Sequence, residues 1–289
     1  MTVGQRPTAQ RRRLRSELRL RRETAGLTQD LVASEMEWSL SKLVRIEAGT
    51  VGISTNDLRA LLRLYGVPDG GELNDLLDLA RASRQRMWWA RYRDILAPSY
   101  LEFIGLEADA STIRYFHPTI VPALFQTEEY ARAMIADGRT RIVEPDQMES
   151  YVAVRMTRVR EVLGRDQPND LTVILDEAVI RRRVGGPAVM RAQLQHLLGI
   201  AARDDVLLRV VPFEAGAHPG LYGSFALLGF ADPNDDVVLY LENAPTDMVL
   251  RDRPMEIAQY ETAFERLTEL ALDEDSSVAL IRDAASILR

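Results

Sequence analysis

The sequence predicts an all-α N-terminal domain of five helices followed by an α+β domain with a small mixed or antiparallel sheet. The chain has 289 residues, more than one hydrophobic core usually supports, and 46% of them are apolar, as in folded globular proteins. The first part shows only short helical patterns, whereas the rest mixes helical patterns with strand-like runs. We therefore expect two domains, residues 1–85 and residues 86–289.

A glycine and a threonine delimit the first two predicted helices. Leu14, Leu18 and Ala25 recur near helical spacing, and Gly26 can adopt the left-handed conformation that closes a helix. Thr28 is then a good N-cap for the second helix. The residues expected to face inward in that helix are Val32, Ala33 and Met36.

The third predicted helix spans Ser39 to Ala48 and begins after a tight turn. Its apolar positions Leu43 and Ile46 are three residues apart and therefore share one face. The residues left on the opposite, exposed face are Ser41, Lys42 and Arg45.

Two further helices complete the predicted N-terminal domain. The fourth begins at Ser54 and ends at Gly66, and the fifth spans roughly Glu72 to Gln85. The inward residues of the fourth helix are Leu58, Leu61, Leu62 and Tyr65.

The C-terminal part is predicted to contain both helices and strands. Helices are expected at residues 127–137, 145–164, 187–203 and 254–272. Strands are expected at residues 171–175, 206–211, 224–230 and 237–241, because these runs combine apolar alternation with β-branched residues. This mixture indicates an α+β domain.

The distribution of charge favours a polyanionic partner for the N-terminal part. Residues 1–50 hold ten Arg and Lys against six Asp and Glu, a net charge of +4. The remainder holds 26 against 37, a net charge of -11. Positive charge is thus concentrated where a nucleic acid could bind, although a solvated arginine-rich helix explains the same count equally well.

The composition also argues against several classes of protein. The chain has no cysteine, so neither disulfides nor a thiolate zinc site can form. Its basic start lacks the apolar region of a signal peptide, and no stretch approaches the ~20 apolar residues that cross a bilayer. We therefore expect a cytoplasmic protein that does not contact a membrane.

The second and third helices form a candidate DNA-reading pair. A helix-turn-helix places its second helix in the major groove while the first crosses the DNA backbone. Thr28 and Gln29 open the supporting helix, and the reading helix carries Lys42 and Arg45 one turn apart. Such side chains reach phosphates and guanine edges, and the helix start at Ser39 offers N–H groups to a phosphate. A double-stranded DNA operator is therefore the expected partner.

Three short runs in this region are Gly26-Leu27-Thr28-Gln29, Ser39-Leu40-Ser41-Lys42-Leu43 and Arg45-Ile46-Glu47-Ala48-Gly49. In order and spacing they resemble the xenobiotic-response-element family of lambda-repressor-like regulators. The resemblance implies that Gln29 contacts a phosphate and that Glu47 is structural. The residues that it places against DNA are Ser41, Lys42 and Arg45. Glu37 stands where the family usually has glycine, and a left-handed conformation there costs about 1 kcal/mol.

Several runs of the C-terminal part also stand out. They are Trp88-Trp89-Ala90-Arg91-Tyr92, Tyr100-Leu101-Glu102 with Gly105-Leu106-Glu107, Val121-Pro122-Ala123-Leu124-Phe125-Gln126-Thr127-Glu128-Glu129-Tyr130-Ala131, Leu175-Asp176-Glu177-Ala178, and Val211-Pro212-Phe213 with Gly216-Ala217-His218-Pro219. They resemble a large group of actinobacterial-type regulators whose C-terminal domain has no settled biochemical function. The resemblance implies an antitoxin-like protein with a small partner protein encoded nearby. Ala123 and Phe125 depart from the glycine and leucine usual in that group.

Two segments form the candidate partner site, residues 121–130 and the loop 213–222. The first combines apolar residues with a helix start, so pocket walls and free N–H donors are expected to coincide. The second has several glycines and prolines between two strands, which is costly unless backbone shape matters; a long hairpin connection is the alternative. The predicted partner-binding residues are Gln126, Thr127, Tyr130, Phe213, His218 and Gly220.

The sequence contains no recognisable catalytic or metal-binding constellation. Its only histidines, His117, His196 and His218, show no ligand spacing with one another. It has no phosphate-binding loop and no dinucleotide glycine motif, so neither a metal nor an organic cofactor is expected. The one hint of acid-base chemistry is that Glu177 and His218 could pair across a cleft.

Together these observations predict a dimeric, sequence-specific transcription regulator that is not an enzyme. A small protein or a ligand bound to the C-terminal domain would control it, and the same domain would supply the homodimer contacts. Two alternatives stay open: an antitoxin-like protein that primarily neutralises a small neighbouring protein, and an enzyme fused to a DNA-binding module.

Overall fold

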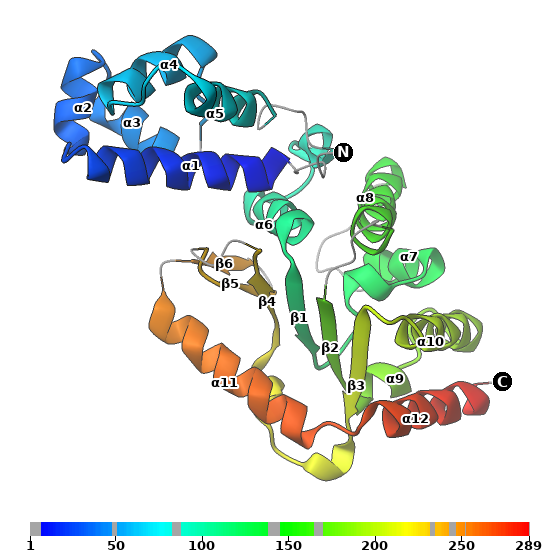
Figure 1. The fold of residues 1–289 in the computed structure, drawn as a ribbon. Coiled ribbons are helices and arrows are strands. Elements are labelled where there is room, and N and C mark those ends of the chain that lie inside the picture. The colour runs from blue at the N-terminus through cyan, green and yellow to red at the C-terminus, as the bar shows by residue number, and fades with distance from the viewer. Residues whose placement is uncertain are drawn as a thin grey trace. The chain divides into compact units, whose positions relative to one another are not determined.

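The chain folds as two units, Met1–Ala90 and Arg91–Arg289. The computed structural model describes residues 7–47, 51–82, 88–137, 145–164, 170–231, 235–242, 247–251 and 253–288. Figure 1 shows a helical N-terminal unit and a C-terminal unit built around a sheet. None of the helices in these ranges combines the length and the apolar character needed to cross a bilayer.

The described part of the N-terminal unit contains five helices, as predicted. They are α1 (Pro7–Thr24), α2 (Gln29–Glu35), α3 (Leu40–Glu47), α4 (Thr55–Leu64) and α5 (Gly71–Ala82). Their apolar faces share one core, in which Leu18, Leu43 and Leu58 are almost completely buried. The predicted all-α domain is confirmed. Ala48 of the predicted third helix and residues 83–85 of the predicted fifth helix lie outside the described residues.

The helix boundaries have the local causes that the sequence predicts. Gly26 and Gly66 follow α1 and α4 with φ angles of 70° and 81°, in the left-handed region that favours glycine. The side chains of Thr28, Ser39 and Ser54 each accept a hydrogen bond from the backbone N–H three residues ahead, at 3.0 to 3.3 Å. These caps make α2, α3 and α4 separate short helices.

One predicted core position of the first helix is wrong. Ala25 is exposed and lies beyond the end of α1, so it does not extend the buried stripe. Arg22 does so instead, because it follows Leu14 and Leu18 at four-residue spacing and is 9% exposed. A charged side chain can occupy this position because a carboxylate from α3 reaches it.

Glu37 adopts the left-handed conformation that its place in the turn implies. Its φ of 55° is the only positive value at a non-glycine residue in the described chain.

We expect Glu37→Gly to stabilise the α2–α3 pair by about 0.5–1 kcal/mol, because glycine removes the steric strain but adds entropy to the unfolded chain. Glu37→Val should destabilise it, since a β-branched side chain tolerates this region poorly. Native-state hydrogen exchange of the α2 and α3 amides measures both changes, and a Glu37→Gly protein with faster exchange would contradict the strain.

The C-terminal unit is built on a six-stranded mixed sheet, which confirms the predicted α+β class. The strands are β1 (Thr112–His117), β2 (Asp170–Asp176), β3 (Val206–Val211), β4 (Ser224–Gly229), β5 (Val238–Glu242) and β6 (Met248–Leu250). Their order is β3-β2-β1-β4-β5-β6, with β1, β2 and β3 parallel and the other pairs antiparallel. The central strand β1 aligns Phe116 with Ile174 on one side and with Phe225 on the other.

Helices cover both faces of this sheet (Figure 1). They are α6 (Pro98–Asp109), α7 (Glu128–Asp137), α8 (Pro145–Leu163), α9 (Glu177–Arg181), α10 (Pro187–Ala201), α11 (Pro254–Leu270) and α12 (Glu274–Ile287). Alternate residues of β1 point to opposite faces: Tyr115 joins the core with Phe103 of α6, and Phe116 joins the core with Phe264 of α11. The sheet is therefore buried between two helical layers.

The structure adds elements that the sequence reasoning did not predict, namely β1, β6, α6, α9 and α12. The predicted helices and strands correspond to the remaining elements within a few residues at each end. Because β1, β2 and β3 are parallel, their carboxyl ends meet at one edge of the sheet, where the following loops can form binding crevices. Both segments of the predicted partner site follow strands at this edge.

Candidate functional site

A buried ion pair joins α3 to α1 and α2. The guanidinium of Arg22 donates to both carboxylate oxygens of Glu47, at 2.7 and 3.2 Å. The side-chain amide of Gln29 donates to the same carboxylate at 2.8 Å. Glu47 is therefore structural, as the resemblance implied. Its partner Arg22 was missed by sequence reasoning, although the four-residue spacing after Leu18 was a usable signal.

The exposed face of α3 carries the predicted DNA contacts. Ser39, Ser41 and Arg45 are exposed, and Arg45 Nε donates to the backbone oxygen of Ser41 at 3.2 Å. Lys42 is partly exposed: its Nζ lies 3.8 Å from the centre of the Trp38 ring and 3.4 Å from a carboxylate oxygen of Asp57. At the start of α2, Thr28 is exposed as an N-cap, while the amide nitrogen of Gln29 is held by Glu47. The structure thus places three of the six predicted residues on α3 and a fourth, Ser39, at its N-terminal cap.

The same helix also exposes two apolar side chains that sequence reasoning did not single out. Leu40 and Val44 are each 41% exposed and lie four residues apart. Their apolar neighbours Leu43 and Ile46 are buried in the core instead. Exposed aliphatic groups on a reading helix can contact thymine methyl groups in the major groove. The face of α3 therefore offers charged, hydroxyl and apolar contacts together.

The first segment of the predicted partner site lies inside the C-terminal unit. Gln126 is 2% exposed and Tyr130 is completely buried. Gln126 donates to the backbone oxygen of Val121 at 2.7 Å, and the hydroxyl of Tyr130 accepts the N–H of Val121 at 3.2 Å. The N–H of Thr127 donates to Gln193 Oε1 at 2.8 Å, so the donor expected to be free there is already satisfied. These contacts give the segment a structural role.

The second segment, the loop 213–222, has a buried part and an exposed part. Gly220 is buried against the ring of Phe116, and a Cβ atom added there would lie 2.1 Å from that ring. Its exposed large apolar side chains are Phe213, Leu221 and Tyr222, at 57%, 60% and 95%. We call these three residues the apolar patch. Of the predicted partner-binding residues, Phe213 is therefore exposed and Thr127 is partly exposed, while the other four are buried.

The expected pairing of Glu177 with His218 is wrong. His218 Nε2 lies 3.1 Å from a carboxylate oxygen of Asp176, the residue before Glu177. Glu177 instead accepts the N–H of Phe213 at 2.9 Å and the Nε–H of Arg181 at 3.0 Å. The loop is thereby tied to the ends of β2 and β3. The sequence could not distinguish two adjacent carboxylates, because a strand end can point either one at the loop.

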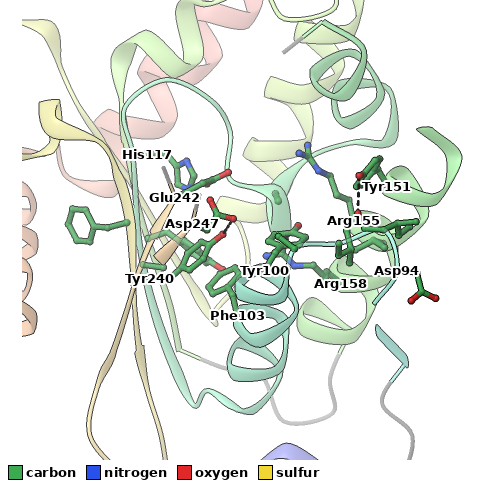
Figure 2. A pocket seen from close by; sticks show the side chains of 18 residues that line it. Asp94, Tyr100, Phe103, His117, Tyr151, Arg155, Arg158, Tyr240, Glu242 and Asp247 are labelled. Carbon is green, nitrogen blue, oxygen red and sulfur yellow. Dashed lines mark hydrogen bonds and ion pairs between the residues drawn. The ribbon is translucent and has the colours of Figure 1, made fainter. Parts of the chain in front are cut away.

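A cavity of about 520 Å³ lies elsewhere in the C-terminal unit. It is lined by residues of α6 and α8, by the segment before α6, and by the sheet, and Figure 2 shows its side chains. The acidic, basic and histidine residues among them are Asp94, His117, Arg155, Arg158, Glu242 and Asp247. Sequence reasoning missed this site, because its walls come from segments that are far apart in the chain.

A fully buried ion pair forms one wall of the cavity. Arg158 of α8 donates to both carboxylate oxygens of Glu107 on α6, at 2.6 and 2.8 Å. Arg158 also donates to the hydroxyl of Tyr100 at 2.5 Å, and the hydroxyl of Tyr115 donates to Glu107. Burial is the main reason that the pKa of Tyr115 is raised well above 10, so its hydroxyl stays protonated as a donor. This network balances the charge of Arg158.

His117 is a buried, neutral member of the cavity wall. It is 4% exposed, its Nδ1 has no hydrogen-bond partner, and its Nε2 lies 3.7 Å from a carboxylate oxygen of Glu242. Burial lowers the pKa of His117 below 6.5, although the charge of Glu242 opposes the shift. The imidazole is therefore uncharged near neutral pH.

Acidification should therefore destabilise the C-terminal unit. Burial lowers the pKa of His196 as well as that of His117, so below about 6.5 the unfolded chain binds protons that the folded chain does not. The free energy of unfolding is expected to fall as the pH drops from about 6.5 toward the folded-state pKa values. Urea unfolding at a series of pH values measures this slope. His117→Gln and His196→Gln should each reduce the dependence of the unfolding free energy on pH. An unchanged slope in both variants would show that these two histidines do not cause it.

Among the residues that the structure describes, no group of three or more His, Asp or Glu side chains is arranged to hold a metal ion. His218 Nδ1 is buried without a hydrogen-bond partner. The arrangements that the unit does offer are the cavity and the apolar patch.

Comparisons with known proteins agree with this division. Residues 13–87 match a family model described as a helix-turn-helix domain, which supports a DNA-binding regulator and the predicted resemblance of the N-terminal part. Residues 100–283 match a model described as a domain of unknown function (DUF5753). The searches of curated proteins and of solved structures found no match. The chain therefore belongs to the family defined by the domain of unknown function DUF5753, here preceded by a helix-turn-helix domain.

Proposed function

We propose that this protein is a dimeric, sequence-specific transcription regulator whose affinity for its operator is controlled by a small protein or a ligand bound to the C-terminal unit. The observation that carries the DNA-binding half is the outward face of α3, where Ser41 and Arg45 are exposed beside Lys42. A helix in the major groove reads bases with such side chains, while a helix start near Ser39 can bind a phosphate.

The rigidity of the α2–α3 pair supports the same function. Base recognition requires side chains held in a fixed position relative to the DNA backbone. The Arg22–Glu47 pair and the Gln29 amide fix α3 relative to α1 and α2 through hydrogen bonds of 2.7 to 3.2 Å. This buried network holds the reading helix before DNA arrives, so little ordering cost is left for binding.

The test of this half is operator mapping followed by measurement of stoichiometry. Sequencing of genomic fragments retained by the full chain should yield one motif with two related half-sites, as expected for a symmetric dimer. Light scattering of the complex with that motif should then give two chains per DNA duplex. Retention of fragments without a common motif would contradict sequence-specific binding, and one chain per duplex would contradict the dimer.

The apolar patch supports control by a protein partner. Phe213, Leu221 and Tyr222 are all exposed on the loop 213–222. Of the three, Tyr222 lines a hollow of about 230 Å³, together with Leu241 and Tyr260. Aromatic side chains next to a hollow are typical of the central contacts of protein interfaces. The partner that we propose for this patch is a small protein encoded beside the regulator.

Tyr222→Ser should weaken binding of that small protein at least ~10-fold, because an exposed tyrosine at the centre of an interface contributes ~2 kcal/mol. Titration of the neighbouring gene product into the full chain measures the change. Ile287→Ser is the matched control, since Ile287 is also exposed but lies at the end of α12. If both substitutions weaken binding equally, or if neither weakens it, the partner binds elsewhere.

A further inference from the structure

The cavity between α8 and the sheet has the size of a small-molecule site. Its volume of about 520 Å³ falls within the range of roughly 300–1,000 Å³ typical of ligand pockets. Its aromatic residues come from the helices α6 and α8 and from the sheet. They are Tyr100, Phe103, Tyr115, Tyr151, Phe225 and Tyr240. Phe103 and Tyr240 stack on one another at 3.7 Å, which makes a flat apolar surface.

One side of the cavity is acidic. Glu242 ends β5 and Asp247 precedes β6, and Figure 2 shows both carboxylates on the same side as His117 and Tyr240. The hydroxyl of Tyr240 donates to Asp247 at 2.7 Å, which orients that carboxylate. Because His117 is neutral near pH 7, it does not compensate the negative charge of Glu242.

The opposite side of the cavity carries the guanidinium of Arg155. Arg155 of α8 lies across the cavity from Glu242 and Asp247 (Figure 2), and it donates to the neutral side-chain oxygen of Gln126 at 2.5 Å. Arg158, one turn further along α8, is paired with Glu107 and adds no net charge. Asp94 points away from the other labelled side chains in Figure 2. The cavity thus presents carboxylates on one side and a guanidinium on the other.

We propose that this cavity binds a zwitterionic small molecule, an aromatic α-amino acid or a dipeptide that contains one. The ammonium group lies against Glu242 and Asp247, and the carboxylate lies against Arg155. The aromatic side chain packs among the tyrosines and phenylalanines that line the cavity. An inorganic anion would face two carboxylates, and a polyamine would face Arg155, so ligands with one sign of charge fit less well.

The proposal deepens the proposed function, since this ligand would be the effector, but binding by itself does not depend on DNA. Calorimetric titration and thermal shift of the full chain use L-tyrosine, L-tryptophan and alanyl-tyrosine as probes. Each should bind, and N-acetyl-L-tyrosine and L-tyrosinamide, which lack one of the two charges, should bind at least ~10-fold more weakly than L-tyrosine. Absence of binding by all three probes at millimolar concentration overturns the proposal, as does equal binding of the blocked derivatives.

Substitutions assign each charge to its wall. Glu242→Gln should weaken L-tyrosine and L-tyrosinamide but leave N-acetyl-L-tyrosine unchanged, because that derivative has no ammonium group. Arg155→Gln should show the opposite selectivity. Glu265→Gln, an exposed position on α11, should change neither. Loss of the contact between Arg155 and Gln126 could destabilise the Arg155→Gln protein. The side chain of Glu242 is 45% exposed, so the Glu242→Gln protein should fold and keeps the test decisive. A uniform loss for all derivatives in Glu242→Gln would contradict the assigned orientation.

A gel shift with operator DNA separates this inference from the proposed function. Binding of L-tyrosine that leaves operator affinity unchanged supports the site and contradicts its role as the effector site. Control of operator affinity by the small protein, together with no binding of any probe, supports the proposed function and overturns the site. Linkage between two sites is reciprocal. If L-tyrosine changes the affinity for operator DNA by some factor, operator DNA must change the affinity for L-tyrosine by the same factor.

Discussion

Replacement of Glu107 by alanine is expected to lower the free energy of unfolding of the C-terminal unit by about 3–5 kcal/mol. Glu107 is completely buried, and its carboxylate accepts hydrogen bonds from Arg158 at 2.6 and 2.8 Å and from the hydroxyl of Tyr115. Its removal leaves a buried guanidinium without its counter-charge, which costs far more than a lost surface ion pair. Native-state hydrogen exchange in urea, followed in peptides from α6, β1 and α8, measures the change.

The double variant Glu107→Leu with Arg158→Leu is the informative control. Replacing both members of a buried pair by apolar residues is often close to neutral, because no charge is left unpaired. The double variant should therefore be more stable than Glu107→Ala by at least ~1 kcal/mol. If the double variant is less stable than Glu107→Ala, the pair stabilises the unit by more than the neutralisation of its two charges. The hydrogen bonds to Tyr100 and Tyr115 would then carry the stability.

The second large effect is expected in DNA binding. Lys42→Ala and Arg45→Ala should each weaken specific operator binding by about 1–3 kcal/mol, if both side chains contact bases, and their combination should approach the non-specific level. Lys42 already interacts with the Trp38 ring and with Asp57, so it must exchange these contacts for those with DNA.

Gel-shift titrations at two salt concentrations measure these losses. A residue that contacts only phosphate lowers affinity for all sequences and reduces the salt dependence, whereas a base contact relaxes specificity at one position. Arg81→Ala is the matched control, because Arg81 is 60% exposed on α5 and is paired with Asp78. Full operator affinity in the Lys42/Arg45 double variant would show that α3 is not the reading helix.

Much of the N-terminal unit could be predicted because its signals are local. Thr28, Ser39 and Ser54 cap helices through the N–H three residues ahead, and Gly26 ends a helix by its own backbone conformation. The strands that were predicted are short runs dominated by apolar residues. Strand β1 was missed because Arg114 and His117 interrupt its apolar pattern. Arg114 is paired with Glu261 of α11, and His117 is buried as a neutral imidazole.

The candidate sites also differ in how far the sequence predicts them. The residues of α3 follow from periodicity, since burying Leu43 and Ile46 leaves the charged face outside. The roles of Gln126, Tyr130 and Gly220 did not follow, because burial depends on what packs above them. Their predicted role in partner binding is still a prediction, while their observed contacts are structural.

The sequence by itself determined the class of each domain, the N-caps of α2, α3 and α4, and the side of α3 that is available to DNA. All of these depend on residues within one or two helical turns of each other, or within one strand. Only the tertiary structure decided that Arg22 pairs with Glu47 and Arg158 with Glu107, residues 25 and 51 positions apart. It also decided which carboxylate meets His218 and that a cavity with opposite charges on its two sides exists. Such contacts require the sheet and its helices to be assembled, because the free energy of burying a charge depends on the partner that three-dimensional packing places beside it.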